Sequence, residues 1–530
     1  MSDQKSFDAI VVGAGFAGMY QLHRLRKQGL SVKVYEAGRD VGGTWYWNRY
    51  PGARCDVQSM EYSYQFCDQL QQEWNWSERY AAQPEILSYA NHVADRFDLR
   101  PDIQFDTKVT SAHFDKSDKR WQITTDTGEA VDAKYFIMAT GCLSSTNTPD
   151  FKGLQSFQGD TYHTGQWPHE GVDFTAKRVA VIGTGSSAIQ SIPIIAEQAA
   201  HLYVFQRTAN YSVPSRNGRM EEDFRDDYKA HYAERRKLAK VNRAGILRAA
   251  NDVPALSVSE EERNQRFEER WEEGGLTFGG AFNDLMLNKE ANATAAEFVR
   301  DKIRQTVKNP AVAELLAPRS LIGCKRPCVD TDYYQTFNRN NVTLVDISDA
   351  PIDEITPSGL TVGPDAYGVD AIVFATGFDA MTGALLKVDI RGKDGQTLAE
   401  SWAEGPRTYL GLMTVGFPNL FTITGPGSPS VLTNMLPSIE QHVEWVSDCI
   451  GFLEANGNTE IEATLAAQNA WVDRVNAIAD ATLYPGCNSW YLGANIPGKP
   501  RVFMPHIGFP DYVAKCDEVA ANNYEGFAVS

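Results

Sequence analysis

The chain has 530 residues, of which 43% are hydrophobic and 22% charged, and 50 basic against 68 acidic side chains leave a formal net charge of −18. This composition is typical of an ordinary globular protein of several domains and excludes small disulfide scaffolds, collagen, coiled coils and disordered chains. The negative charge disfavours nucleic acid and anionic membranes as partners, and no apolar run is long enough to span a bilayer, so we expect a cytoplasmic protein.

The first clear pattern along the chain is a strand, a glycine-rich turn and a helix. An apolar run over residues 7–12 precedes the turn, whose glycines are Gly13, Gly15 and Gly18. Such glycines allow a tight turn, the close approach of a pyrophosphate and close packing of helix on strand. A second strand, residues 31–35, ends on Glu36, whose carboxylate can accept hydrogen bonds from ribose hydroxyls. This unit is predicted to bind a dinucleotide without a 2′-phosphate.

The same pattern returns at residues 178–208. A strand over 178–182 leads into a turn and a helix that reaches residue 199, and the turn residues are Gly183, Thr184, Gly185, Ser186 and Ser187. The next strand ends not on an acid but on Arg207 and Thr208, which can bind a phosphate through a guanidinium and a hydroxyl. The second unit is therefore predicted to prefer NADPH, and two dinucleotides of opposite ribose preference suggest a flavin that NADPH reduces.

Each nucleotide unit ends in the tripeptide Ala-Thr-Gly, at residues 139–141 and 375–377. These small residues either let the chain pass close to a dinucleotide or form an ordinary tight turn. Their order implies that the second unit is inserted into the first. We predict an α/β fold of two Rossmann-like domains, with FAD bound by residues 1–145 and 385–530, NADP bound by 150–215 and 335–380, and a charged helical subdomain, 220–330, inserted in the NADP domain.

Eight cysteines are spread along the chain, and no Cys-x-x-Cys pair occurs. We expect them to be reduced and mostly buried. Cys324 and Cys328 are closest in sequence, but no neighbouring His or Cys completes a zinc site, so no metal is predicted.

Residues 157–168 carry a further spaced pattern, F-x-G-x-x-x-H-x-x-x-W-P, formed by Phe157, Gly159, His163, Trp167 and Pro168. It resembles the fingerprint of the type I Baeyer–Villiger monooxygenases. The likeness extends over nearly the whole chain through residues 42–45, 50–52, Asp56, 324–327, 425–442 and 489–500. Residues 425–430, Gly-Pro-Gly-Ser-Pro-Ser, look most like the phenylacetone, steroid and cyclic ketone branch.

The resemblance implies a flavoenzyme that oxidises a ketone to an ester or lactone with FAD, NADPH and O2, through a flavin C4a-peroxide. Its partners would be the ketone and O2, with neither nucleic acid nor a membrane involved; the oligomeric state stays open, with a monomer as one option.

A peroxide anion in a site without water needs a permanent cation, and arginine qualifies because it stays protonated on burial. The resemblance points to Arg326 as this cation, acting in the manner of an oxyanion hole and held in place by Asp56. A surface ion pair is the alternative for both residues.

The resemblance implies binding roles for further residues. Lys325 would pair with the 2′-phosphate beside Arg207 and Thr208, and Trp490 would contact the nicotinamide ribose unless it is an ordinary packing residue. Thr44, Trp45 and Asp56 would flank the flavin. Met435 and Leu436 would line an apolar substrate cavity.

His163 and Trp167 lie four residues apart in a segment that joins the two predicted domains. Packing and hinge hydrogen bonds explain them better than acid–base chemistry, and the resemblance implies a similar role, in positioning the domains.

Three other functions remain open. A related flavin monooxygenase that oxygenates nitrogen or sulfur has the same fold, although its fingerprint typically lacks the Trp167-Pro168 pair. A pyridine nucleotide disulfide reductase is disfavoured because it needs a thiol pair beside the flavin. A flavin-bearing sensor without turnover is the third alternative.

Overall fold

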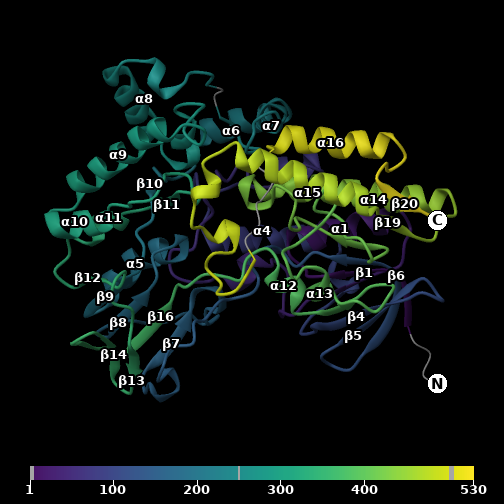
Figure 1. The fold of residues 1–530 in the computed structure, drawn as a ribbon, viewed down its shortest axis with the longest axis horizontal. Helices are drawn as coiled ribbons and strands as arrows, with labels where there is room; N and C mark the ends of the chain where they lie inside the picture. Colours follow the sequence, from purple (N-terminus) through teal and green to yellow (C-terminus); the bar gives the residue numbers. More distant parts are fainter. Residues whose placement is uncertain (1–4, 249–250, 501–506) are drawn as a thin grey trace.

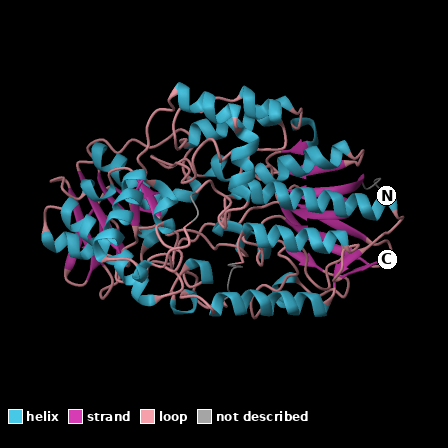
Figure 2. Ribbon diagram, turned by 90° about the horizontal axis from the view of Figure 1, so that it is seen from above, coloured by secondary structure: helices cyan, strands magenta, loops and turns pink. Residues whose placement is uncertain are grey.

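The computed structural model describes residues 5–248, 251–500 and 507–530. Two β-sheets lie at opposite ends of the molecule, and loops and helices fill the space between them (Figure 2). Residues 1–4, 249–250 and 501–506, which the predicted domain boundaries include, lie outside the described part of the chain.

The larger sheet is built around β1 (Lys5–Val12), which pairs in parallel with β2 (Val32–Tyr35) and β6 (Ala130–Met138). Across the sheet the order is β17 (Asp389–Arg391), β4 (Val109–Asp115), β5 (Arg120–Thr125), β6, β1, β2 and β3 (Ile103–Gln104), and β18 (Leu420–Thr422) also pairs with β6. Strands from both ends of the chain thus form one sheet.

The smaller sheet is parallel throughout, in the order β12 (Val342–Asp346), β9 (His201–Gln206), β8 (Arg178–Ile182), β16 (Ala371–Phe374) and β7 (Asp160–His163). An antiparallel meander accompanies it: β13 (Glu354–Thr356), β14 (Gly359–Val362) and β15 (Asp365–Gly368). Because this sheet is complete before the larger one resumes at β17, the predicted α/β fold with one Rossmann-like unit inserted in the other is confirmed.

Helices α1 (Phe16–Lys27) and α5 (Ser186–Gln198) follow β1 and β8 directly, as the glycine motifs predict. The long helix α14 (Met435–Ala455) packs against α1, where the hydroxyl of Tyr20 donates to Glu444 over 2.9 Å. Helix α16 (Phe509–Ala521) packs against α14, and Trp471 of α15 (Leu465–Asp480) lies beside Tyr512 of α16, with ring centroids 6.1 Å apart (Figure 1). The core of the larger sheet is therefore closed by chain that comes from the C-terminal part.

The charged segment forms helices, as predicted, but they pack against two different cores. The helices are α6 (Glu222–Ala230), α7 (Tyr232–Lys240), α8 (Glu260–Glu273), α9 (Lys289–Thr306) and α10 (Pro310–Leu316). Tyr228 and Tyr232, from α6 and α7, are buried in the core next to the larger sheet, whereas Phe267 and Val299, from α8 and α9, are buried in the core of the smaller one. The segment thus links the two sheets.

Among the described residues, no helix is both long and apolar enough to cross a membrane. The same part of the chain holds no group of three or more His, Cys, Asp or Glu side chains arranged to bind a metal ion.

Candidate active site

A cavity of about 630 Å³ lies where the two nucleotide units meet. Its lining comes from both halves of the chain, because each unit turns the carboxyl ends of its parallel strands toward the same space. The predicted site residues that line it are Gly13, Gly15, Glu36, Thr44, Trp45, Asp56, Ser186, Arg326, Met435 and Trp490.

The first glycine motif leaves room for a ligand at the start of α1. Gly13 has φ +101°, and a Cβ on it would lie 2.8 Å from the carbonyl oxygen of Ala139, so the first Ala-Thr-Gly touches the motif directly. A Cβ on Gly43 would lie 2.8 Å from the Cα of Gly15. Only glycines permit this approach. The backbone N–H groups at the beginning of α1 therefore face a site that a pyrophosphate fits.

Glu36 follows β2 directly and lines the same cavity. Its carboxylate accepts hydrogen bonds from the backbone N–H groups of Ala14 (2.6 Å) and Gly38 (2.7 Å). Burial raises the pKa of Glu36, while these N–H groups act in the opposite direction. The carboxylate is thus fixed beside the glycine turn, where it has further lone pairs for the hydroxyls of a ribose.

The second glycine motif repeats this construction. Gly183 has φ +115°, and its missing Cβ would collide with the carbonyl oxygen of Ala375, in the second Ala-Thr-Gly. Gly185 caps α5, and a Cβ on it would meet no described atom within 4 Å, so the helix N-terminus opens into free space. Ser187 at the start of α5 contacts Thr164 through their hydroxyls at 3.0 Å.

Two cations lie near each other beside the second motif. Strand β10 (Ser212–Pro214) pairs with β11 (Cys328–Asp330), which brings Lys325 close to Arg207, the residue that follows β9. Burial, and then the charge of Arg207, lower the pKa of Lys325. Within the described chain neither cation has an ion pair or a hydrogen bond to an acceptor. Two adjacent, unpaired cations suit a phosphate, so the residues present fit the 2′-phosphate of NADPH.

Arg326 projects into the cavity and is held by Asp56. Its Nε lies 2.7 Å from Oδ2 of Asp56, its Nη2 donates to Oδ1 over 2.9 Å, and its Nη1 donates to the carbonyl oxygen of Val431 over 3.0 Å. Burial is the largest influence and lowers the pKa of Arg326, but the Asp56 carboxylate and the smaller contributions of Tyr491 and Cys55 together outweigh it, so this pKa lies above its ordinary value. This is a partly buried, fixed pair and not a surface ion pair.

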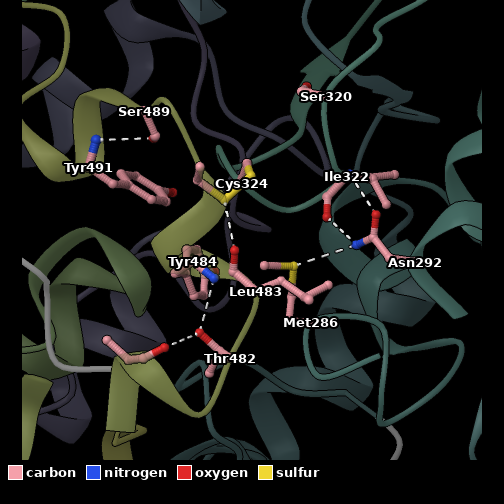
Figure 3. Close-up of a disulfide and its surroundings, with 12 residues drawn as sticks. Met286, Asn292, Ser320, Ile322, Cys324, Thr482, Leu483, Tyr484, Ser489 and Tyr491 are labelled. Atoms are coloured by element: carbon pink, nitrogen blue, oxygen red, sulfur yellow. Dashed lines mark hydrogen bonds between the residues drawn. A yellow bond between two sulfur atoms is a disulfide. The ribbon is translucent and has the colours of Figure 1, made fainter. Parts of the chain in front are cut away.

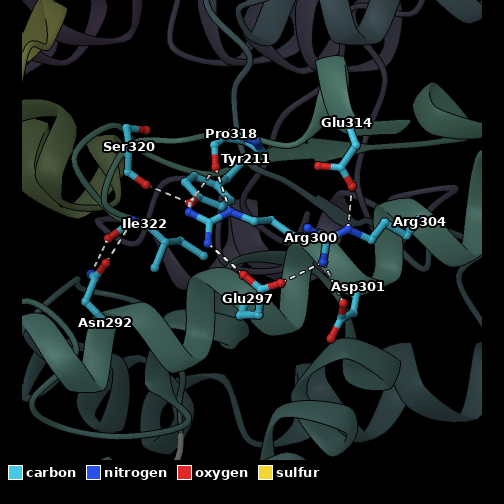
Figure 4. A network of polar contacts seen from close by, with 10 residues as sticks. All are labelled: Tyr211, Asn292, Glu297, Arg300, Asp301, Arg304, Glu314, Pro318, Ser320 and Ile322. Carbon is cyan, nitrogen blue, oxygen red and sulfur yellow. Dashed lines mark hydrogen bonds and ion pairs between the residues drawn. The ribbon is translucent and has the colours of Figure 1, made fainter. Parts of the chain in front are cut away.

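The loop that carries Arg326 is anchored to α9 (Figure 4). Arg300 donates from Nε to the carbonyl oxygen of Pro318 over 2.8 Å, and the side chain of Asn292 both donates to and accepts from the backbone of Ile322, over 2.8 and 3.1 Å. From the C-terminal loop, the hydroxyl of Tyr491 accepts a hydrogen bond from the backbone N–H of Arg326 over 3.1 Å. Helix α9 and the C-terminal loop thus place the cation together.

The fingerprint residues Phe157, Gly159, His163 and Trp167 lie outside the cavity lining, and His163 lies where the chain crosses between the two sheets. At the crossing, Asn147 donates from its backbone to the carbonyl oxygen of Gly377 over 3.0 Å, so the two connecting segments run side by side. Nε2 of His163 lies 3.3 Å from the carbonyl oxygen of Asn147 and 3.4 Å from Oγ1 of Thr376. Burial lowers the pKa of His163. His163 therefore sits on the connection between the domains.

The other fingerprint residues are packing residues. Trp167 is buried in the core of the smaller sheet beside Phe174, with ring centroids 6.1 Å apart. Phe157 packs against a second hydrophobic cluster of the smaller sheet, separate from the one that contains Trp167. A Cβ on Gly159 would lie 2.6 Å from the Phe157 ring.

Two expectations are wrong. Leu436 does not line the cavity: Met435 and Leu436 begin α14, where successive side chains point about 100° apart, and Leu436 is fully buried in the core beside α1. The cysteines are not all reduced, because Cys324 and Cys487 form a disulfide. Val431 and Tyr491 were not predicted as partners of Arg326, although both lie in segments that carry the resemblance. A backbone carbonyl oxygen, or a hydroxyl far away in the chain, leaves no pattern in the sequence around Arg326.

Comparison with known proteins places these features in a family. Residues 10–263 match the family model described as pyridine nucleotide-disulphide oxidoreductase. A protein from Pseudooceanicola batsensis named Baeyer-Villiger monooxygenase is 46% identical, with 98% of this chain and 95% of the relative covered. Phenazine N-monooxygenase PhzNO1 from Lysobacter antibioticus is 43% identical, with 99% and 97% covered.

Solved structures are similar over their whole length. A structure entitled oxidized steroid monooxygenase bound to NADP matches with a TM-score of 0.95 and 54% identity, covering 99% of both chains. A structure of OTEMO in complex with FAD and NADP matches with a TM-score of 0.96 and 44% identity, covering 100% of both chains.

Proposed function

Since this chain belongs to the Baeyer–Villiger monooxygenases, we propose that it oxidises an apolar ketone to an ester or lactone with FAD, NADPH and O2, and that Arg326 is the catalytic cation. One observation carries the assignment of Arg326: a guanidinium held by Asp56 lines the cavity into which both nucleotide units open. In this proposal a fixed guanidinium would lie where the two dinucleotides meet.

The FAD site is the first motif. Gly13, Gly15 and Gly18 would cradle the pyrophosphate, Glu36 would bind the ribose, and Thr44, Trp45 and Asp56 would flank the flavin ring. When bound, FAD supplies the reduced flavin that activates O2, and NADPH supplies the hydride that reduces it. We assign residues 1–145 and 385–530 to this domain.

The NADP site is the second motif. Gly183, Thr184, Gly185, Ser186 and Ser187 would hold the pyrophosphate, and Arg207, Thr208 and Lys325 would bind the 2′-phosphate. Trp490 lines the shared cavity and would contact the nicotinamide ribose. We assign residues 150–215 and 335–380 to this domain, with residues 220–330 as its helical insertion, and His163 and Trp167 as residues that set how the two domains meet.

Arg326 keeps donors free for an oxygen anion. A guanidinium has five N–H groups, and its contacts with Asp56 and Val431 use only some of them. The remaining N–H groups can hydrogen-bond the negative oxygen that develops during oxygen insertion, while Asp56 keeps the planar group from turning away. Arginine suits this task better than lysine, because it does not lose its proton on burial.

The substrate would meet an apolar wall. Val431, Met435 and Ile439 line the cavity beside Arg326, which fits a ketone whose carbonyl faces the guanidinium and whose carbon skeleton faces these side chains. The similarity to a steroid monooxygenase makes bulky ketones the first to test.

A panel of ketones assayed aerobically with NADPH tests the proposal, with esters identified by mass. Formation of an ester, with one NADPH consumed for each, is expected; NADPH oxidation without any ester from the panel would refute it. The similarity to a phenazine N-monooxygenase makes N-oxygenation the second candidate, so the panel includes a phenazine. An N-oxide as the dominant product in competition with ketones would favour that candidate.

A further inference from the structure

A covalent link joins two segments that are far apart in the chain. Cys324 and Cys487 are separated by 163 residues and form a disulfide with their Cα atoms 5.4 Å apart (Figure 3). Both cysteines are buried, with exposed fractions of 5% and 2%. The remaining described cysteines are free thiols.

Each half of the disulfide is adjacent to residues of the proposed site. Cys324 immediately precedes Lys325 and Arg326, and Cys487 precedes Trp490 by three residues. Arg326 and Trp490 line the same cavity, from opposite segments. The disulfide therefore ties the segment of Lys325 and Arg326 to the segment of Trp490, which would cover the nicotinamide.

The two segments are held by different parts of the molecule. The segment before Cys324 is anchored to α9 by Arg300 and Asn292. The apolar cluster around the disulfide is small: Cys324, Cys487 and Leu492 form it, with Leu321 and Tyr484 partly buried against it. Further along, the segment of Cys487 is held near the crossing between the domains, where Asn495 donates to the carbonyl oxygen of Phe378 over 2.8 Å and Lys499 pairs with Asp379. Those contacts do not join it to the segment of Arg326, so the disulfide is the covalent tie between the two segments.

A second tie runs parallel to the disulfide. The backbone N–H of Arg326 donates to the Tyr491 hydroxyl over 3.1 Å, and this bond spans the same two segments. A hydrogen bond of this kind survives only while the segments stay together. Asp56 and Val431 hold the guanidinium itself independently, so opening the disulfide leaves the charge of Arg326 in place but removes the covalent tie between its segment and that of Trp490.

We propose that the Cys324–Cys487 disulfide is a redox-sensitive positioning element, which holds the segment of Trp490 against the segment of Lys325 and Arg326 so that NADP stays bound and oxygen insertion stays coupled to NADPH use. The proposal rests on the proposed function for its coupling, but not for its effect on NADP binding. In the reducing step a dithiol transfers two electrons and two protons: the protein S–S bond breaks to give two thiols, and the dithiol closes to its own disulfide.

The experiment begins with the purified holoenzyme prepared without reductant. Digestion without reduction, followed by mass spectrometry, is expected to find the peptides of Cys324 and Cys487 joined. One portion is then treated with dithiothreitol and freed of it, a second is mock-treated, and part of the first is re-oxidised. Each portion is measured for FAD content, for the Kd of NADP⁺ by calorimetry, and for ester formed per NADPH consumed.

Reduction is expected to raise the Kd of NADP⁺ several-fold and to lower the ester formed per NADPH several-fold at unchanged FAD content, and re-oxidation to restore both. C324S and C487S should behave like reduced wild type and be insensitive to dithiothreitol. C67S, which removes a free, partly exposed thiol elsewhere, should behave like wild type.

Free thiols at both positions in the untreated protein, or an unchanged Kd of NADP⁺ on reduction, would overturn the proposal. The Kd of NADP⁺ is measured without turnover. A failure to form any ester would therefore refute the proposed function, while the effect of reduction on NADP⁺ binding would still test the role of the disulfide.

Discussion

Arg326 and Asp56 are 270 residues apart in the sequence, yet their side chains form a two-point ion pair at 2.7 and 2.9 Å on the wall of the shared cavity. The pair brings together one residue from the segment after the first glycine unit and one from the end of the helical insertion. Because neither side chain is fully enclosed, we expect the pair to contribute little to stability, and we propose that it orients the charge of Arg326.

Replacement of Arg326 separates flavin reduction from oxygen insertion. In Arg326→Ala we expect NADPH to bleach the flavin at a normal rate, because the NADP contacts remain, while ester formation falls by about 10²-fold to 10³-fold, as for the loss of an oxyanion-hole donor. Flavin absorbance under anaerobic conditions and ester yield in air are the two measurements. Asp56→Asn, which keeps the side-chain shape but not the charge, should lose less. Normal ester formation by Arg326→Ala would contradict the assigned role.

Single Gly→Ala substitutions should distinguish the functions of the two glycine turns. Gly13→Ala places a Cβ against the carbonyl oxygen of Ala139 at φ +101° and should abolish FAD binding, whereas Gly183→Ala does the same at Ala375 and should leave FAD bound but weaken NADPH binding. Gly29→Ala is the matched control, since Gly29 has φ +82° but no described atom within 4 Å of a Cβ. The flavin-to-protein ratio and the KM for NADPH are measured. Full FAD content in Gly13→Ala would exclude the first motif as the flavin site.

Arg207 and Lys325 should determine the choice of coenzyme. Removing either cation costs a charge-assisted contact to the 2′-phosphate, so Arg207→Ala is expected to raise the KM for NADPH by about 10-fold to 100-fold and to leave the KM for NADH nearly unchanged. Arg339→Ala, which removes an exposed arginine elsewhere in the smaller-sheet unit, controls for the change in net charge. Equal loss with both coenzymes would mean that Arg207 does not bind the 2′-phosphate.

Glu440 should make stability fall as the pH rises. Its carboxyl group is buried on α14, and burial raises its pKa from 4.5 to about 7, although the backbone N–H groups of Gln65 and Phe66 and the nearby Arg236 act in the opposite direction. The folded state then binds the proton more tightly than the unfolded state, so this contribution is complete below pH 4.5 and is lost as the pH rises through 7, by at most about 3 kcal/mol.

Glu440→Gln keeps the acceptor oxygen for the two N–H groups and cannot ionise. We expect the Tm of the variant to change less between pH 5 and pH 8 than that of the wild type. Some dependence should remain, because burial also raises the pKa of Glu61 to about 7. Parallel Tm profiles for variant and wild type would show that Glu440 does not titrate in this range.

Part of this protein can be predicted without a structure because the signal is local. A strand, a glycine-rich turn and a helix lie within about thirty residues, so the motifs at Gly13 and Gly183 predict two nucleotide units. The return of strand patterns after residue 380 predicts that one unit is inserted in the other. The fingerprint around His163 is equally local. The α/β class, both cofactors and the part of the cavity lining that belongs to the glycine motifs follow from such segments.

Tertiary structure alone decides how these segments meet. Periodicity could not place Leu436 in the core and Met435 in the cavity, because the direction of a helix face depends on what α14 packs against. Nor could it pair Cys324 with Cys487 or put the Val431 carbonyl on Arg326, since each contact joins residues more than a hundred positions apart. Short-range steric preferences and hydrogen bonds determine the elements of this chain, whereas the geometry of its site arises only when the two sheets and the C-terminal loops are packed against one another.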